Sequence, residues 1–489
     1  MASFLIAFLS PLKSLALLAG ILLLALAFYR PLAVIFFLAA YTPFEPFLLK
    51  FAPDEIYVYA RYFGEFLIYA IALTLIFKFL IKKIKIEKTL LNLPFVLFIA
   101  VALTSIIINF VPLNIGLLGL RMLIRYILIF FIIIHLKPNK NQIKILIWLM
   151  FLIVLLQSGL GIAQKFIGYR LDNLLLPRQE KIIGSISLTT GTEQIWAYGE
   201  RVFGTLSRYD QLGTFLTFFM LLILGLIYQK YFSHKNKLWI FIWFLISALA
   251  LLFTYSRSSW FGFLLGVFII GYLIKKDKKI IKIYSLGIAI IIIYLLISPL
   301  VVSQLIDQPQ ISLTERFFEA FSYRRWESEY YGLGRLFFIV KTPLIVVASS
   351  PLVGVGPGQY GSGTAHALHN TAVYDKLNLP FGIWGTEGHI DNNWMSIWGE
   401  VGTLGLIFYI WMIYALFKMS YQVYKNTNDN FVKGLALGYC GAIVAVCLNA
   451  FLATMFEVRT LALYFWLFGG IIFLFYKNVT PTFGSENHS

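Results

Sequence analysis

The chain has 489 residues, of which 60% are hydrophobic and 13% are charged, and its mean hydropathy is +0.80. Soluble globular domains carry about 25% charged residues, so this composition excludes a soluble globule. The formal net charge of +17 does not imply nucleic acid as a partner, because most lysines lie in short clusters between apolar runs, as in membrane proteins.

The apolar runs predict about twelve or thirteen membrane-spanning helices, because most of them reach or approach the roughly 20 residues that a spanning helix needs. The fold class predicted is therefore an all-α, polytopic transmembrane helical bundle. No small-residue cleavage site precedes Arg30, so we expect the first run to be a retained helix. In chain order the predicted spans are 12–29, 31–50, 65–84, 92–111, 115–136, 142–166, 210–232, 237–254, 259–275, 280–303, 392–418, 434–457 and 459–476.

Lysine clusters predict the orientation, because from Lys82 onward they fall in every second connection and cytoplasmic loops are rich in lysine. Two long connections then lie outside, and the second, rich in aromatic residues and glycine, is expected to be partly helical. The predicted organisation is 1–303 with ten transmembrane helices and a first long outer loop at 168–210, 304–390 as a large outer loop, 391–477 with the last transmembrane helices, and 478–489 as a polar cytoplasmic tail.

Arginines break this charge pattern, because they lie in connections predicted to be outside, where positive charge is depleted. Guanidinium binds phosphate with two hydrogen bonds and stays protonated, so these arginines indicate a lipid-linked phosphate or diphosphate ligand. The alternative is pairing with Glu315, Glu319, Glu327 and Glu329 on a solvated helix. The outer arginines are Arg201, Arg208, Arg257, Arg316, Arg324, Arg325 and Arg335.

Two of the arginine predictions rest on their place in the sequence. Arg257 lies in a short link between two apolar runs, with no acid nearby in sequence to neutralise it. Arg121 and Arg125 lie four residues apart within the fifth apolar segment and share one helix face. Because an intramembrane arginine is costly, Arg121 is a further ligand candidate, with structural pairing between helices as the alternative.

His389 and Asp391, just before the predicted span at 392–418, are the candidates for a catalytic base. Histidine, with an ordinary pKa near 6.5, would make the rate rise through about pH 6 to 7, whereas aspartate would give a flat profile there. The alternative is that Asp391 or Asn392 caps the following helix. His366 and His369 are suitably spaced on a helix for metal binding, but no nearby cysteine completes a zinc pattern.

Four stretches resemble, in order and spacing, the O-antigen ligase and O-antigen polymerase superfamily. They are RVFGTL at 201–206, SRSSWFG at 256–262, PLVGVGPG at 351–358 and NNWMSIWGEVGTLG at 392–405. The resemblance implies an inverting, metal-independent glycosyltransferase without a cofactor, multi-pass in the bacterial inner membrane. It also implies an undecaprenyl-diphosphate-linked glycan as donor, a saccharide or glycolipid acceptor, and a site on the periplasmic face.

The resemblance also implies that Arg201 and Arg257 hold the diphosphate. From their charge and position we expect Arg121, Arg324 and Arg325 to help neutralise it. Family members commonly place a histidine where this chain has Asp391, and an asparagine where it has Asp210. The base is therefore His389 or Asp391, and a polymerase and a ligase fit equally well.

Two other functions remain open at this point. A metal-dependent glycosyltransferase could use Asp54 and Glu55, an acidic pair in the first predicted outer loop. A transporter of lipid-linked oligosaccharides would use similar arginines without chemistry. Transporters, however, place charges near the bilayer midplane beside broken helices, whereas these charges concentrate in the outer loops.

Overall fold

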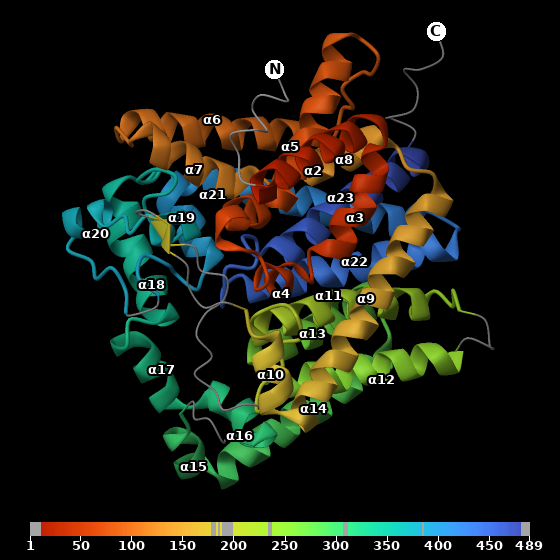
Figure 1. Cartoon of the computed structure of the whole chain (residues 1–489). Helices are drawn as coiled ribbons and strands as arrows, with labels where there is room; N and C mark the ends of the chain where they lie inside the picture. Colours follow the sequence, from red (N-terminus) through yellow and green to blue (C-terminus); the bar gives the residue numbers. More distant parts are fainter. Residues whose placement is uncertain are drawn as a thin grey trace.

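The computed structural model describes residues 11–177, 182–183, 186–187, 199–232, 237–306, 312–383 and 386–480. Almost all of their regular structure is helical (Figure 1). Two-residue strands β1 (Ile182–Ile183) and β2 (Ile186–Ser187) form one small antiparallel pair. Most of the predicted tail, from residue 481 on, and much of the predicted 168–210 loop lie outside the described residues.

Nine helical stretches of the described residues are long and apolar enough to cross a membrane. They are α2 (Pro11–Tyr29), η1 with α5 (Asp54–Ile56 and Tyr57–Leu80), α9 (Lys140–Ile167), α11 (Tyr209–Tyr228), α13 with η3 (Arg257–Phe268 and Ile269–Ile274), α14 (Lys278–Ile297), α21 (Asn393–Asn426), α22 (Asn430–Asn449) and α23 (Arg459–Val479).

The other four predicted spans also coincide with apolar helices. Three are shorter: α3 (Pro31–Tyr41), α6 (Asn92–Ile108) and α12 (Lys237–Phe253). The fourth is a broken span, in which α7 (Leu113–Ile124) and α8 (Ile127–Leu136) meet at an angle of 54°. Every predicted span therefore overlaps a helix, and the all-α, polytopic membrane fold is confirmed.

Most of the short helices gather on the left of Figure 1, which we call the loop end. The opposite end, which we call the lysine end, is where Lys477 and Glu87 form an ion pair of 2.9 Å. The segment between α14 and α21 is partly helical, as predicted. The short helices are α4 (Glu45–Leu49), α10 (Tyr169–Leu175), α15 (Pro299–Gln304), α16 (Leu313–Phe318), η4 (Glu319–Phe321), α17 (Tyr323–Tyr331), α18 (Arg335–Lys341), η5 (Thr342–Val347), α19 (Gly363–Ala367) and α20 (Ala372–Lys376).

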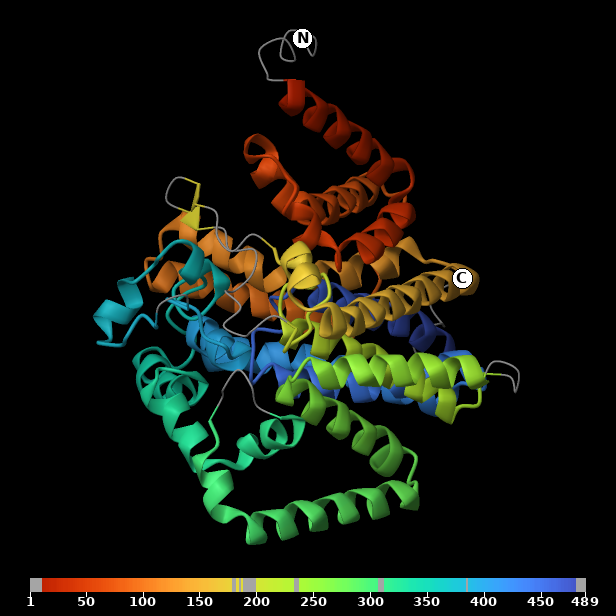
Figure 2. The same ribbon diagram turned by 60° about the horizontal axis from the view of Figure 1, so that its bottom comes forward.

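The centre of the bundle is formed by α11, α22 and α23, whose apolar side chains are almost all buried. Small residues let two of these helices touch through their backbones: a Cβ on Gly225 would lie 2.2 Å from the carbonyl oxygen of Gly434. At the opposite extreme, α14 runs along the edge of the molecule in Figure 2 and has no buried residue. Its Tyr294 ring stacks on Phe318 of α16, with ring centroids 3.7 Å apart.

A break in α21 holds the glycine-rich segment that contacts the backbone of the candidate bases. Gly402 interrupts the helix with φ of 65°, a conformation that glycine adopts without strain. The glycine-rich segment 351–362 enters this break, where the amide of Val355 donates to the carbonyl of Gly399 at 2.9 Å. A Cβ on Gly402 would lie 2.4 Å from the backbone nitrogen of Gly354. Two of the four family-like stretches therefore pack directly on each other.

Candidate active site

A fully buried carboxylate, Glu319, lies among three arginines at the loop end. Arg257, the first residue of α13, approaches its Oε2 at 3.1 Å, and Arg316 of α16 approaches the same oxygen at 2.6 Å. Arg325 of α17 lies 3.6 Å from Oε1. We call these four residues the Glu319 cluster. Three guanidinium groups around one carboxylate concentrate positive charge, which suits a ligand with several negative charges.

The cluster joins elements far apart in sequence. The Nε of Arg316 donates to the carbonyl oxygen of Tyr255 at 3.2 Å, which holds α16 against the link before α13. From sequence, Glu319 is expected only as a partner of arginines on a solvated helix, because no acid lies near Arg257 in sequence. The missed signal is that Glu319 follows two phenylalanines and precedes Ala320 and Phe321. An acid within an apolar run needs a buried partner.

The second element of the site is Asp391, which faces two arginines from other parts of the chain. The Nη2 of Arg335 lies 3.6 Å from its Oδ2. Burial acts to raise the pKa of Asp391, but the charges of Arg208 and Arg335 outweigh burial and hold that pKa below its usual range. Arg208 also pairs with Asp210, at 3.0 Å. Asp391 is therefore a carboxylate at neutral pH.

The third element is His389, which is held in place by its neighbour: the amide of Ile390 donates to the carbonyl of Gly361 at 3.0 Å. Burial lowers the pKa of His389 to about 4, although Asp391 acts in the opposite direction. Its buried Nε2 makes no hydrogen bond with any residue that the structure describes. His389 therefore presents a neutral ring nitrogen at physiological pH.

The alternative reading of this segment as a helix cap applies to Asn392. Its side chain accepts a hydrogen bond from the amide of Met395 at 3.1 Å, which makes it the N-cap of α21. The carboxylate of Asp391 is directed to Arg335 instead. Asn392 is thus the residue that caps α21, and the carboxylate of Asp391 is not needed for the cap.

The three elements form one continuous network. Arg325 forms an ion pair with Glu329, whose Oε2 accepts a hydrogen bond from the amide of Arg335 at 3.1 Å. Arg335 in turn reaches Asp391. The Glu319 cluster is therefore connected through α17 and α18 to the segment with His389. Of the predicted site residues, the structure brings Arg257, Arg325, His389 and Asp391 together.

The remaining predicted arginines lie in three different places. Arg201 is only 4% exposed, and its guanidinium lies 4.5 Å from the centre of the Tyr209 ring, next to Arg208 in sequence. Arg324 is exposed and donates to the side chain of Gln304 at 3.3 Å. Arg121 lies in a second charged cluster, 3.6 Å from Glu65.

A buried carboxylate of α21 holds the glycine-rich segment beneath the site. The Oε1 of Glu400 accepts hydrogen bonds from the amides of Gly358, at 2.9 Å, and Tyr360, at 3.4 Å. Glu400 is fully buried. The carbonyl of Gly361, in the same segment, accepts the hydrogen bond from the amide of Ile390. Glu400 therefore helps to position the backbone between His389 and Asp391.

Residues 242–410 match a family model described as O-antigen ligase. This segment is therefore similar to O-antigen ligases. It runs from α12 into α21 and contains the Glu319 cluster, Arg335, His389 and Asp391. No curated protein matches the chain. The match supports the resemblance read from the sequence over this segment.

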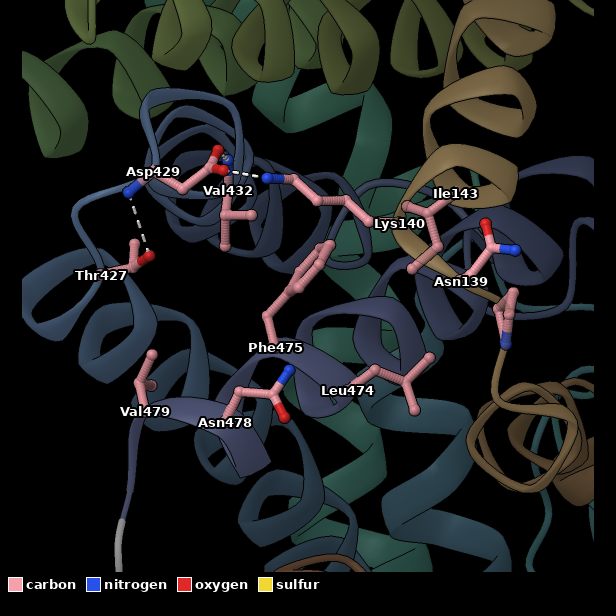
Figure 3. A pocket seen from close by; sticks show the side chains of 11 residues that line it. Asn139, Lys140, Ile143, Thr427, Asp429, Val432, Leu474, Phe475, Asn478 and Val479 are labelled. Atoms are coloured by element: carbon pink, nitrogen blue, oxygen red, sulfur yellow. Dashed lines mark hydrogen bonds and ion pairs between the residues drawn. The ribbon is translucent and has the colours of Figure 1, made fainter.

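Two further features lie apart from this network. Asp54 and Glu55, the acidic pair considered for metal binding, are both exposed on η1. A pocket at the lysine end lies between α9, α22 and α23, where Lys140 pairs with Asp429 (Figure 3). Its floor is apolar and includes Phe475 and Val432. The residues that line this pocket include none of the Glu319 cluster.

Proposed function

We propose that this protein transfers a glycan from a polyprenyl-diphosphate-linked donor to a saccharide acceptor, without metal and with inversion at the anomeric carbon. The reaction would occur on the periplasmic face of a bacterial inner membrane, during assembly of O-antigen or another surface polysaccharide. Undecaprenyl diphosphate is the expected carrier. The segment 304–390, which supplies most of the site, would be the large outer loop.

The Glu319 cluster is the observation that carries this proposal. Departure of a diphosphate leaves negative charge on the oxygen that linked it to the sugar, and stabilising this charge requires donors already in position. Arg257, Arg316 and Arg325 converge on one carboxylate and are largely shielded from water, so they can stabilise that charge strongly. Arg201, whose guanidinium lies 4.5 Å from the centre of the Tyr209 ring, is a further candidate ligand of the diphosphate.

The proton from the acceptor hydroxyl would go to His389. In the step we propose, the acceptor oxygen attacks the anomeric carbon, the bond to the diphosphate oxygen breaks, and the proton moves to the ring nitrogen. Asp391 is a weaker base because two arginines lower its pKa. A diphosphate bound close to the imidazole would add negative charge there, which would raise the pKa of His389 and make its ring a better acceptor of the proton.

The polyprenyl chain would lie along α14. This helix has no buried residue, and its outer surface is almost entirely isoleucine and leucine. Through Tyr294 and Phe318 it reaches α16, the helix that carries Arg316. An apolar chain on α14 would therefore end at the Glu319 cluster, where its diphosphate is needed.

The pH profile should differ from that of an ordinary histidine base. Because the pKa of His389 is about 4, its ring is already neutral at pH 6. We expect kcat/KM to be flat between about pH 6 and 8 and to fall only as the pH approaches 4, where the ring gains a proton. Initial rates across this range test the expectation. A rise centred between pH 6 and 7 would contradict it.

The orientation can be tested with single cysteines in intact cells. One variant carries cysteine in place of Tyr331, which is 76% exposed at the loop end. The other carries cysteine in place of Lys278, the first residue of α14. We expect a membrane-impermeant maleimide to label the cysteine at 331 and to leave the one at 278 unlabelled. Labelling at 278 and not at 331 would place the site on the cytoplasmic face and contradict the proposed localisation.

The experiment that tests the function is transfer by the purified protein. Incubation with a lipid-diphosphate glycan, with and without acceptor and with a chelator present, should yield product. A ladder of lengths identifies a polymerase, and a single shifted band identifies a ligase. Loss of activity with chelator would favour the metal-dependent alternative that uses Asp54 and Glu55.

One observation favours transport as a second candidate function. The break between α7 and α8 lies beside Arg125, a buried arginine within the bundle, and transporters use such broken helices at their substrate sites. A transporter would move the lipid-linked glycan without forming a glycosidic bond. The same assay separates the two functions, because a transporter gives no new product in detergent.

A further inference from the structure

The helix α17, which lies at the edge of the molecule in Figure 1, has two faces of different character. On one face Arg325 and Glu329, four residues apart, pair with each other, and Arg325 also approaches Glu319. The other face carries tyrosines, a tryptophan and one acid, and no residue of α17 is buried. We call this set the aromatic face; its members are Tyr323, Trp326, Glu327, Tyr330 and Tyr331.

The helical repeat brings these five side chains together. Residues three and four apart are neighbours on a helix surface, so Glu327 lies beside all three tyrosines and Trp326 lies beside two of them. Tyr323 and Tyr331 are 71% and 76% exposed, and Trp326 is 44% exposed. At a rise of about 1.5 Å per residue, the aromatic face is about 12 Å long. It is therefore a continuous surface that an extended ligand can cover.

Two contacts hold rings of this surface in place. The indole Nε1 of Trp326 donates to the carbonyl oxygen of Ala320 at 2.9 Å. The Tyr330 ring packs on Phe337 of α18, with ring centroids 5.8 Å apart. Rings that are already fixed lose little conformational freedom when a ligand packs on them, so the aromatic face is prepared for binding.

The charges of α17 argue against burial of this face in the bilayer. Tyrosine and tryptophan are enriched both at membrane interfaces and in binding surfaces, so the charged residues decide between the two. Four of the nine residues of α17 are charged. Glu327, which lies amid the rings, is exposed and forms no ion pair with any residue that the structure describes. A carboxylate in this position is costly in hydrocarbon but is accessible to a polar ligand.

Aromatic rings beside a carboxylate suit a sugar. One face of a pyranose ring consists of C–H groups, which pack on an aromatic ring, and its hydroxyl groups donate hydrogen bonds to a carboxylate. The aromatic face also lies next to the proposed donor site, because Arg325 of the same short helix lies 3.6 Å from Glu319. A glycan attached to a diphosphate at the Glu319 cluster would therefore extend from α17 itself.

We propose that the aromatic face of α17 binds sugars of the donor glycan that are remote from its diphosphate. The sugars stack on the rings of Tyr323, Trp326 and Tyr331, and Glu327 accepts hydrogen bonds from their hydroxyl groups. The inference rests on the proposed function, because a donor at the Glu319 cluster is what brings the glycan to α17. It follows that the protein prefers a long glycan to a single repeat.

Binding of free oligosaccharide tests this surface without relying on activity. The probe is oligosaccharide released by mild acid from the surface polysaccharide of the cells that make the protein, titrated calorimetrically into the full chain in detergent. Replacing Tyr323 and Tyr331 together by leucine should weaken binding by roughly ten- to a hundredfold, the combined effect of losing two aromatic contacts. Replacing both by phenylalanine keeps the rings and should leave the affinity within about twofold of the wild type. Equal affinities of the leucine variant and the wild type, or no binding by the wild type, would overturn the proposal.

A second variant distinguishes sugar binding from contact with the bilayer. If the face binds sugars, Glu327→Leu should weaken oligosaccharide binding roughly tenfold, because an acceptor for their hydroxyl groups is lost. If the face lies in the bilayer, the same change should raise thermal stability in lipid nanodiscs and leave oligosaccharide binding unchanged, and that result would overturn the proposal. The control Tyr59→Leu, at a tyrosine of α5 that is 66% exposed, should bind oligosaccharide as the wild type does.

Kinetics separate this inference from the proposed function. In the leucine double variant at 323 and 331, KM should rise roughly tenfold for a donor with several repeats and much less for a donor with one repeat. An equal rise for both donors would assign these tyrosines a structural role and overturn the inference. Transfer by a wild-type protein that binds no free oligosaccharide would overturn this inference alone. Oligosaccharide binding without any transfer would support the sugar-binding surface and contradict the proposed function.

Discussion

Replacing Arg257 by lysine is expected to lower kcat about 10²- to 10³-fold, the usual cost of removing one donor that stabilises a leaving oxygen. Lysine keeps the positive charge and can still pair with Glu319. It lacks the planar fork that lets arginine hold Glu319 and two phosphate oxygens together. Replacing Arg257 by alanine should be at least as damaging.

Steady-state rates with a lipid-linked donor measure this effect, and thermal unfolding in detergent shows whether the variant is folded. Arg170→Lys, at an exposed arginine of α10, is the matched control and should keep the wild-type rate. A near wild-type rate for Arg257→Lys would show that the position needs only a cation. That result would contradict the proposal that the guanidinium of Arg257 binds the diphosphate through two hydrogen bonds.

Replacing His389 by alanine should lower kcat about 10²- to 10⁴-fold at saturating acceptor, because no general base would remain to accept the proton of the acceptor hydroxyl. Stability should change little, since the buried Nε2 makes no hydrogen bond within the described residues. Asp391→Asn should have a smaller effect, because Arg208 and Arg335 already make Asp391 a weak base.

These two variants separate the candidate bases. A larger loss for Asp391→Asn than for His389→Ala would transfer the role to Asp391, which occupies the position of the family's usual histidine. Near-normal turnover for both variants would show that neither residue is the general base. Only the role of the arginines would then remain of the proposed mechanism. Asn392→Ala, which removes the cap of α21, is a structural comparison and should cost about 1 kcal/mol of stability.

The helices could be predicted from sequence because a membrane span leaves a long apolar run, and every predicted span overlaps a helix. The two breaks could not be predicted. Gly402 is one of many glycines, and only the approach of Gly354 to its backbone shows that α21 opens there. The bend between α7 and α8 falls at Arg125 and Tyr126, where the sequence has neither glycine nor proline.

The candidate site was predicted in part, for a physical reason. Residue chemistry alone identifies arginines and a histidine that suit a diphosphate and a hydroxyl. Which arginines meet depends on tertiary packing: Glu319 lies far from Arg257 in sequence yet contacts it, and Arg121 joins Glu65 instead. An acid within an apolar run, such as Glu319 or Glu65, is the sequence signal that a charged cluster will form around it.

If the arginines of the Glu319 cluster stabilise a departing diphosphate, each transfer should release one polyprenyl diphosphate without a metal ion. The most direct measurement is the amount of polyprenyl diphosphate released per glycosidic bond formed by the purified protein in the presence of chelator. We predict one molecule of diphosphate per bond, at an undiminished rate, and a loss of both products in Arg257→Lys. Bond formation without release of polyprenyl diphosphate, or release that requires a divalent metal, would contradict this account.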